Sequence, residues 1–127
     1  MPRRTAGGRA VDLSIVVPLF NEVATLEELH RRVTEVTMML GLETEIIYVD
    51  DGSIDGTGEM ATAISKRESS VRLVRLARNY GQTAALTAGF DAAAGDVIVA
   101  MDGDLQHAPE PWSGPQSVVG GSERVLQ

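Results

Sequence analysis

The chain has 127 residues, of which 43% are hydrophobic and 23% charged, which fits one small globular domain with a single core. It contains no cysteine and two histidines, so disulfides and thiolate metal sites are excluded and a zinc cluster is a poor candidate. The net charge of −7 argues against nucleic acid as a partner, because an electrostatic grip on phosphates needs a basic face.

Residues 1–11 are basic through Arg3, Arg4 and Arg9 but lack the apolar core of a signal peptide after them. We expect a disordered leader here, with weak contact to an anionic membrane surface as the alternative. No stretch reaches the ~18 consecutive apolar residues of a membrane span, so we expect this chain to be soluble and without a transmembrane segment.

Four short apolar runs predict buried strands, at residues 13–17, 45–49, 71–76 and 96–101. The stretches between them predict helices. The first follows Thr25, which forms a capping-box pattern with Glu28, and it ends at Gly41. The second helix is expected at 57–66. The third is expected at 83–94, with an alanine-rich face that packs closely on the sheet and with Gly95 as its terminator.

The order β-α-β-α-β-α-β predicts an α/β fold with a parallel sheet and right-handed crossovers. Ligands of such sheets bind beyond the carboxyl ends of the strands. The polar clusters of this chain all follow predicted strand ends: they are residues 18–22, 50–57, 78–82 and 102–104. We therefore expect one binding site at that edge of the sheet.

The pair Asp102 and Asp104 follows the last apolar run directly, with Gly103 between them. In an extended segment, residues two apart point the same way, so both carboxylates can face one site. Oxygen ligands of this kind suit Mg²⁺ or Mn²⁺, which commonly share their coordination with substrate phosphates. The alternative is a turn whose two aspartates face water.

Other polar residues at these strand ends have two interpretations each. Asp51 either binds a nucleobase or the metal, or it belongs to an Asx turn. Glu22 either contacts the ligand or favours the start of the helix. Arg78 either reaches a diphosphate or is an ordinary surface cation. His107 follows the aspartate pair and is either solvated or catalytic.

Four motifs in this order, at residues 14–22, 50–57, 78–82 and 101–107, resemble the family 2 glycosyltransferases of GT-A fold. Within that family they are most similar to the polyprenyl-phosphate sugar transferases. The resemblance covers about residues 12–110, as the N-terminal half of a nucleotide-sugar-binding domain. It implies a truncated, Rossmann-like nucleotide-diphospho-sugar transferase fold. It also implies a donor-binding set comprising Pro18, Phe20, Glu22, Val49, Asp51, Arg78, Met101, Asp102, Gly103 and Gln106.

The resemblance further implies that Asp102 and Asp104 hold Mg²⁺ or Mn²⁺ against the diphosphate of a UDP- or GDP-sugar. The reaction would transfer the sugar, with inversion, to an acceptor such as polyprenyl phosphate, which is already ionised and needs little help from a base. The full-length family would act at the cytoplasmic face of the membrane. No catalytic base is assigned, because the acceptor half of the family domain is not represented.

The pattern departs from the family at residues 107–110, where His-Ala-Pro-Glu stands in place of His-Pro-Pro-Glu, and the resemblance ends after Glu110. We expect residues 111–127 to form an irregular tail rich in breakers. The alternative function is therefore a nucleotide-sugar-binding fragment without turnover. The sequence leaves the oligomeric state, the sugar and the base open.

Two other enzyme classes fit less well. A dinucleotide oxidoreductase would carry G-x-G-x-x-G after the first strand, where this chain has Pro18-Leu19-Phe20-Asn21-Glu22. A phosphoaspartate enzyme would resemble Asp-x-Asp-Gly-Thr, whereas Asp104 is followed by Leu105 and Gln106.

Overall fold

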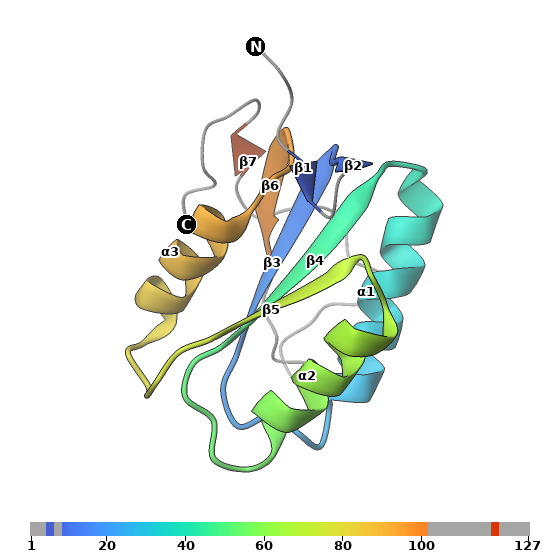
Figure 1. The fold of residues 1–127 in the computed structure, drawn as a ribbon. Helices are drawn as coiled ribbons and strands as arrows, with labels where there is room; N and C mark the ends of the chain where they lie inside the picture. Colours follow the sequence, from blue (N-terminus) through green and yellow to red (C-terminus); the bar gives the residue numbers. More distant parts are fainter. Residues whose placement is uncertain (1–4, 7–8, 102–117, 120–127) are drawn as a thin grey trace.

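The computed structural model describes residues 5–6, 9–101 and 118–119 (Figure 1). Its elements in chain order are β1 (Thr5–Ala6), β2 (Arg9–Ala10), β3 (Leu13–Leu19), α1 (Leu26–Leu40), β4 (Thr44–Asp50), α2 (Thr57–Arg67), β5 (Val71–Arg75), α3 (Gln82–Ala92), β6 (Val97–Ala100) and β7 (Val118–Val119). The four strands and three helices expected from the sequence are present with small shifts at their ends.

The main sheet has the strand order β5-β4-β3-β6-β7, and the first four of these strands are mutually parallel. β3 lies in the middle, where Leu19 is opposite Asp50 of β4 and Val16 is opposite Ala100 of β6. The predicted parallel α/β sheet is therefore confirmed. The loops that follow β3 and β4 emerge together at the lower end of the view in Figure 1.

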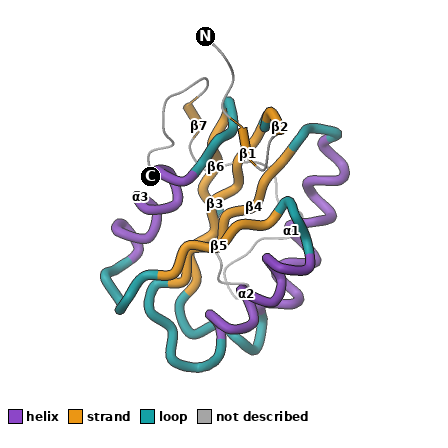
Figure 2. The backbone as a smooth tube through the Cα atoms, in the orientation of Figure 1, coloured by secondary structure: helices purple, strands orange, loops and turns teal. Residues whose placement is uncertain are grey.

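Helices cover both faces of the sheet: α1 and α2 lie on one face and α3 on the other (Figures 1 and 2). Alternate residues of β3 serve the two layers, because Ile15 and Val17 pack under α1 and α2 whereas Val16 packs under α3. This two-sided burial explains why the strands are apolar without alternation. The α3 layer is tight: a Cβ on Gly89 would lie 2.3 Å from Cγ1 of Val16.

Three local expectations about helix ends have different outcomes. α1 ends at Gly41 with a φ of 66°, as predicted. The capping box is wrong, because the Thr25 side chain makes no capping hydrogen bond and Glu28 accepts hydrogen bonds from Arg31 and Arg32 of its own helix. Gly95 does not terminate α3, which ends at Ala92 with an extended residue after it.

Short strands are also described near the two ends of the chain. Within the expected leader, β1 and β2 pair as an antiparallel hairpin, and Val11 is buried with its carbonyl accepting the Asp96 N–H at 3.2 Å. Within the expected irregular tail, β7 pairs antiparallel with β6. Among the described residues, no helix is both long and apolar enough to cross a membrane.

Candidate functional site

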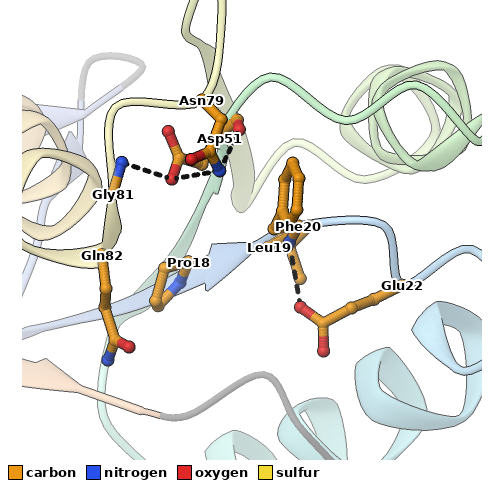
Figure 3. Close-up of a pocket in the computed structure, with 8 residues that line it drawn as sticks. All are labelled: Pro18, Leu19, Phe20, Glu22, Asp51, Asn79, Gly81 and Gln82. Atoms are coloured by element: carbon orange, nitrogen blue, oxygen red, sulfur yellow. Dashed lines mark hydrogen bonds between the residues drawn. The ribbon is translucent and has the colours of Figure 1, made fainter.

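A cleft of about 240 Å³ opens where β3 and β4 end and α3 begins (Figure 3). It lies at the carboxyl edge of the parallel strands, where α/β sheets bind ligands. The segment after β3 forms one wall and the segment before α3 forms the other. The lining consists of Pro18, Leu19, Phe20, Glu22, Asp51, Asn79, Gly81 and Gln82.

Asp51 is the carboxylate at the base of the second wall, and it is only 4% exposed. Its Oδ1 accepts a hydrogen bond from the Tyr80 N–H at 2.8 Å. Its Oδ2 accepts two more, from the Gly81 N–H at 3.0 Å and from Nδ2 of Asn79 at 3.1 Å (Figure 3). Its own N–H donates to the Leu19 carbonyl at 2.9 Å. Asp51 therefore joins both walls of the cleft.

The residue before it, Asp50, has a different place. Its side chain turns back into the β4–α2 loop, where Oδ1 accepts the Ser53 N–H at 3.1 Å, and its Oδ2 lies 3.6 Å from Nε of Arg75. The Asx-type turn that the sequence left open for this motif thus belongs to Asp50. The carboxylate of Asp51, by contrast, lines the cleft.

Gly52 explains how the β4–α2 loop and the segment before α3 come so close. Its φ is 76°, and a Cβ built there would lie 2.3 Å from the carbonyl carbon of Arg78. A side chain at this position would have to displace main chain, which cannot move as easily as the end of a flexible side chain. The glycine is therefore required both by backbone conformation and by space.

The wall formed by the β3–α1 loop carries Phe20 and Glu22. Oε1 of Glu22 accepts the Phe20 N–H at 3.0 Å (Figure 3), and Phe20 lines the cleft with 45% of its surface exposed. The Glu22 N–H donates to Oγ1 of Thr57 at 2.8 Å. Thr57 in turn donates to Asp55, and this side-chain hydrogen bond holds the pKa of the Asp55 carboxyl below its usual range.

The structure brings part of the predicted donor-binding set together. Pro18, Phe20, Glu22 and Asp51 line the cleft. Leu19, Asn79, Gly81 and Gln82 also line it and were not singled out from the sequence, although residues 78–82 were recognised as a polar cluster after a strand.

Three predicted residues lie elsewhere. Val49 is fully buried and packs in the core under α3, so its side chain does not form the cleft. Arg78 is exposed, with Cζ 5.0 Å from the centre of the Tyr80 ring, as in a cation–π contact. Met101 is half-buried against the core, and its N–H donates to the Val16 carbonyl at 2.9 Å.

The predicted metal ligands Asp102 and Asp104, together with Gly103, Gln106 and His107, lie outside the described residues. Within residues 10–101, no group of three or more His, Asp or Glu side chains is arranged to hold a metal ion. Met101, which precedes Asp102, donates its N–H to the carbonyl of Val16 in β3. Val16 lies two residues before Pro18, which lines the cleft. The metal prediction therefore concerns residues that directly follow this edge of the sheet in sequence.

Comparison with known proteins agrees with this architecture. The family model described as glycosyl transferase family 2 matches residues 14–116. An undecaprenyl-phosphate 4-deoxy-4-formamido-L-arabinose transferase from Pseudomonas aeruginosa (strain LESB58) is 47% identical over 102 residues, which cover 79% of this chain and 30% of the relative. The chain thus spans less than a third of the length of this curated relative.

Two solved structures share the fold. A mannosyltransferase from Pyrobaculum calidifontis, in complex with GDP-Man and Mn²⁺, superposes with a TM-score of 0.62 at 22% identity, covering 79% of this chain and 29% of that one. A glucosyl-3-phosphoglycerate synthase from Mycobacterium tuberculosis, in complex with Mn²⁺, UDP and glucosyl-3-phosphoglycerate, superposes with a TM-score of 0.57 at 28% identity, covering 74% and 34%. Given the match over residues 14–116, the chain belongs to glycosyl transferase family 2.

Proposed function

We propose that the cleft binds the nucleotide of a UDP- or GDP-sugar, as the donor site of a glycosyltransferase. The observation that carries the proposal is Asp51, a carboxylate only 4% exposed that lines the cleft beside Phe20 and Glu22. The relatives support it, since one solved neighbour is named as a complex with GDP-Man and another as a complex with UDP.

The chemistry of the lining suits a nucleobase. A carboxylate oxygen can accept two hydrogen bonds, and Oδ1 of Asp51 accepts one from the Tyr80 N–H. The remaining acceptor site can take a ring N–H, which both uracil and guanine possess. The exposed face of Phe20 offers a stacking surface at the cleft mouth.

We further propose that Asp102 and Asp104 hold Mg²⁺ or Mn²⁺ beside this cleft. Two carboxylates on alternate residues form the hard oxygen set that these cations prefer, and Met101 links the start of that segment to β3. When bound, the cation would neutralise charge on the diphosphate of the donor and so favour its departure.

For the complete protein, we propose inverting transfer of the sugar to a polyprenyl phosphate at the cytoplasmic face of a membrane. The Pseudomonas aeruginosa relative is named as an undecaprenyl-phosphate transferase, and this name supports a polyprenyl phosphate as the acceptor. A phosphate acceptor is ionised at neutral pH, so its oxygen can attack without a strong general base. The second candidate, for these 127 residues by themselves, is donor binding without turnover, since their match spans 30% of the length of that relative.

Isothermal titration calorimetry of this chain with UDP and with GDP, in Mn²⁺ and in EDTA, tests the donor site. We expect one nucleotide to bind in Mn²⁺ and to bind at least about tenfold more weakly in EDTA, a difference of about 1.4 kcal/mol. Asp104→Asn should remove the dependence on Mn²⁺, whereas Asp91→Asn on the exposed face of α3 should retain it. Binding of neither nucleotide in Mn²⁺ would refute the proposal.

A radiolabelled donor and a short-chain polyprenyl phosphate separate the two candidates. Product formation supports transfer by this chain. Metal-dependent binding without product supports the donor-binding fragment.

A further inference from the structure

We infer that Asn21 is a positioning residue, which sets Phe20 and Glu22 on the cleft wall without lining the cleft itself. The inference rests on the proposed function, because it concerns the donor site. Its starting observation is an alternation: the residues on both sides of Asn21 line the cleft, and Asn21 does not. Asn21 lies between two cleft residues, Phe20 and Glu22, but its side chain contacts another part of the chain.

The backbone at Asn21 is the first part of the explanation. Its φ is 51°, and it is the only residue other than glycine with a positive φ in the part of the chain that the structure describes. Asparagine tolerates this left-handed conformation better than other side chains do. The reversal brings Glu22 back toward β3, where its carboxylate accepts the Phe20 N–H at 3.0 Å. The two cleft residues are thereby connected across Asn21.

The side chain of Asn21 supplies the second part. Oδ1 of Asn21 accepts the Ile54 N–H at 2.9 Å. The main-chain N–H of Asn21 adds a second contact, because it donates to Oγ of Ser53 at 2.8 Å. Both contacts belong to the β4–α2 loop, more than thirty residues away along the chain. Asn21 is thus held from outside the cleft by the same loop that carries Asp51.

The following residues extend this connection. The Glu22 N–H donates to Oγ1 of Thr57 at 2.8 Å, and the Val23 N–H donates to Oδ2 of Asp55 at 3.3 Å. We call this set, from Asn21 to Val23 with its partners in the β4–α2 loop and Thr57 at the start of α2, the loop clamp. Asn21 is its only member that combines a left-handed backbone with a side-chain hydrogen bond to the other loop.

The position of Asn21 at the surface predicts where its loss would be felt. It is exposed and belongs to neither hydrophobic core cluster of the described residues, so its replacement leaves the packing of the sheet intact. The hydrogen bond to Ile54 and the left-handed turn should therefore matter more for the geometry of Phe20 and Glu22 than for global stability.

Three substitutions separate these contributions. Asn21→Ala removes the acceptor and strains the left-handed backbone. Asn21→Gly removes the acceptor and keeps the backbone accessible. Asn21→Asp retains an oxygen in the place of Oδ1. The matched control is Gly41→Ala, which introduces the same backbone strain at a φ of 66° in open space at the far end of α1.

Affinity for the nucleotide that the unmodified chain binds in Mn²⁺ is the first measurement. We expect Asn21→Ala to weaken binding about tenfold, as the loss of one hydrogen bond and a turn preference would, and Asn21→Asp to stay within about threefold. Asn21→Gly should lie between them, and Gly41→Ala should bind normally. Unchanged binding by Asn21→Ala, or equal losses in the alanine and aspartate variants, would overturn the inference.

A double-mutant cycle shows whether Asn21 acts through its neighbour. In a Glu22→Gln background, Asn21→Ala should weaken binding clearly less than it does in the unmodified chain, because the group that it positions has already been altered. Fully additive losses would show that Asn21 does not act through Glu22.

Amide hydrogen exchange without nucleotide keeps this test separate from that of the proposed function. We expect faster exchange at Phe20 and Ile54 in Asn21→Ala and Asn21→Gly. The Ile54 N–H loses its acceptor, Oδ1 of Asn21, and the Glu22 carboxylate that accepts the Phe20 N–H is no longer held in place by Asn21. Unchanged exchange at both amides would overturn the inference, whether or not any nucleotide binds. If the unmodified chain binds neither UDP nor GDP, the proposed function fails while the exchange result still decides the role of Asn21.

Discussion

The carboxylate of Asp51 accepts the main-chain N–H of Gly81 at 3.0 Å, which ties the end of β4 to the residue that precedes α3. The two residues are thirty positions apart in sequence, and the contact closes the cleft on that side. Asp51 thus has a structural task in addition to any contact with a ligand. A substitution there should change the shape of the cleft as well as its chemistry.

Asp51→Asn should weaken this connection even though it preserves side-chain size. An amide has one acceptor oxygen and one donor group, so it cannot accept all three hydrogen bonds that the carboxylate accepts from Asn79, Tyr80 and Gly81. We expect the free energy of unfolding to fall by about 1–3 kcal/mol and the amides of Tyr80 and Gly81 to exchange faster.

The control for this prediction is Glu35→Gln, which removes one charge from an exposed ion pair with Arg31 on α1. It should change the free energy of unfolding by no more than about 0.5 kcal/mol. Urea denaturation and hydrogen exchange measure both variants. Unaltered exchange at Tyr80 and Gly81 in Asp51→Asn would show that the carboxylate does not hold this segment.

Gly52→Ala should be costly for a reason that a second glycine isolates. Gly52 and Gly41 both have positive φ values, 76° and 66°, but a Cβ at Gly52 would lie 2.3 Å from main chain at Arg78 whereas one at Gly41 meets nothing within 4 Å. We expect Gly41→Ala to lose about 1 kcal/mol through backbone strain alone. Gly52→Ala should lose about 1–3 kcal/mol more, because the neighbouring segment must move. Equal losses in urea denaturation would contradict the contact.

Much of the fold was predictable because burial on both faces makes parallel strands apolar throughout. The exception at β3 is instructive. The sequence predicted its end at Val17, before a proline that cannot donate, yet β3 continues to Leu19. The Val16 carbonyl accepts a hydrogen bond on the β6 side of β3, and the Leu19 carbonyl accepts one on the β4 side. Because main-chain polar groups alternate between the two sides along a strand, the main-chain nitrogen of Pro18 faces the β6 side. β6 pairs with β3 only as far as Val16, so no N–H is needed there.

The cleft lies at the edge of the sheet that the sequence predicted, but only some of its lining residues could be predicted. Polar clusters after strands indicated the right edge of the sheet, and Pro18, Phe20, Glu22 and Asp51 do line the cleft. The contribution of Asn79, Gly81 and Gln82 depends on how the segment before α3 folds back onto Asp51. That closure results from contacts thirty residues apart, and no local pattern encodes it. The failed capping box has a local origin instead, because Glu28 accepts hydrogen bonds from Arg31 and Arg32 of its own helix.

Tyr48 and His30 form a buried polar pair whose two members should depend on each other. Nδ1 of His30 lies 2.7 Å from the Tyr48 hydroxyl, and its Nε2 lies 2.9 Å from Oε2 of Glu68. Burial, with smaller contributions from the negative charges of Glu68 and Glu27, raises the pKa of Tyr48 well above its usual range. The phenol therefore stays protonated in its hydrogen bond with Nδ1 of His30, and Nε2 on the other side of the ring is hydrogen-bonded to Glu68.

We expect Tyr48→Phe and His30→Leu each to lower the free energy of unfolding by about 1–3 kcal/mol, because each leaves a buried polar group without its partner. The double variant should lose clearly less than the sum, since it removes both groups at once. A double-mutant cycle by urea denaturation measures the coupling. Strictly additive losses would show that the two groups do not support each other.

Asp55 should make the loop clamp sensitive to acid. The side-chain hydrogen bond from Thr57 lowers the Asp55 pKa below the ordinary 3.8, with smaller help from the N–H groups of Thr57 and Val23 and opposition from burial. A carboxyl whose pKa is lower in the folded than in the unfolded state stabilises the fold above the unfolded value, and this contribution is lost as pH falls through the folded value. The stability difference between the unmodified chain and Asp55→Asn should thus be constant near neutral pH and shrink below 3.8.

Thr57→Val, which lacks the main donor, should reduce this pH dependence, whereas Thr57→Ser should keep it. Thermal unfolding of all four proteins across this pH range provides the comparison, and a difference between the unmodified chain and Asp55→Asn that does not change with acidification would mean that the carboxylate of Asp55 does not stabilise the clamp through its charge.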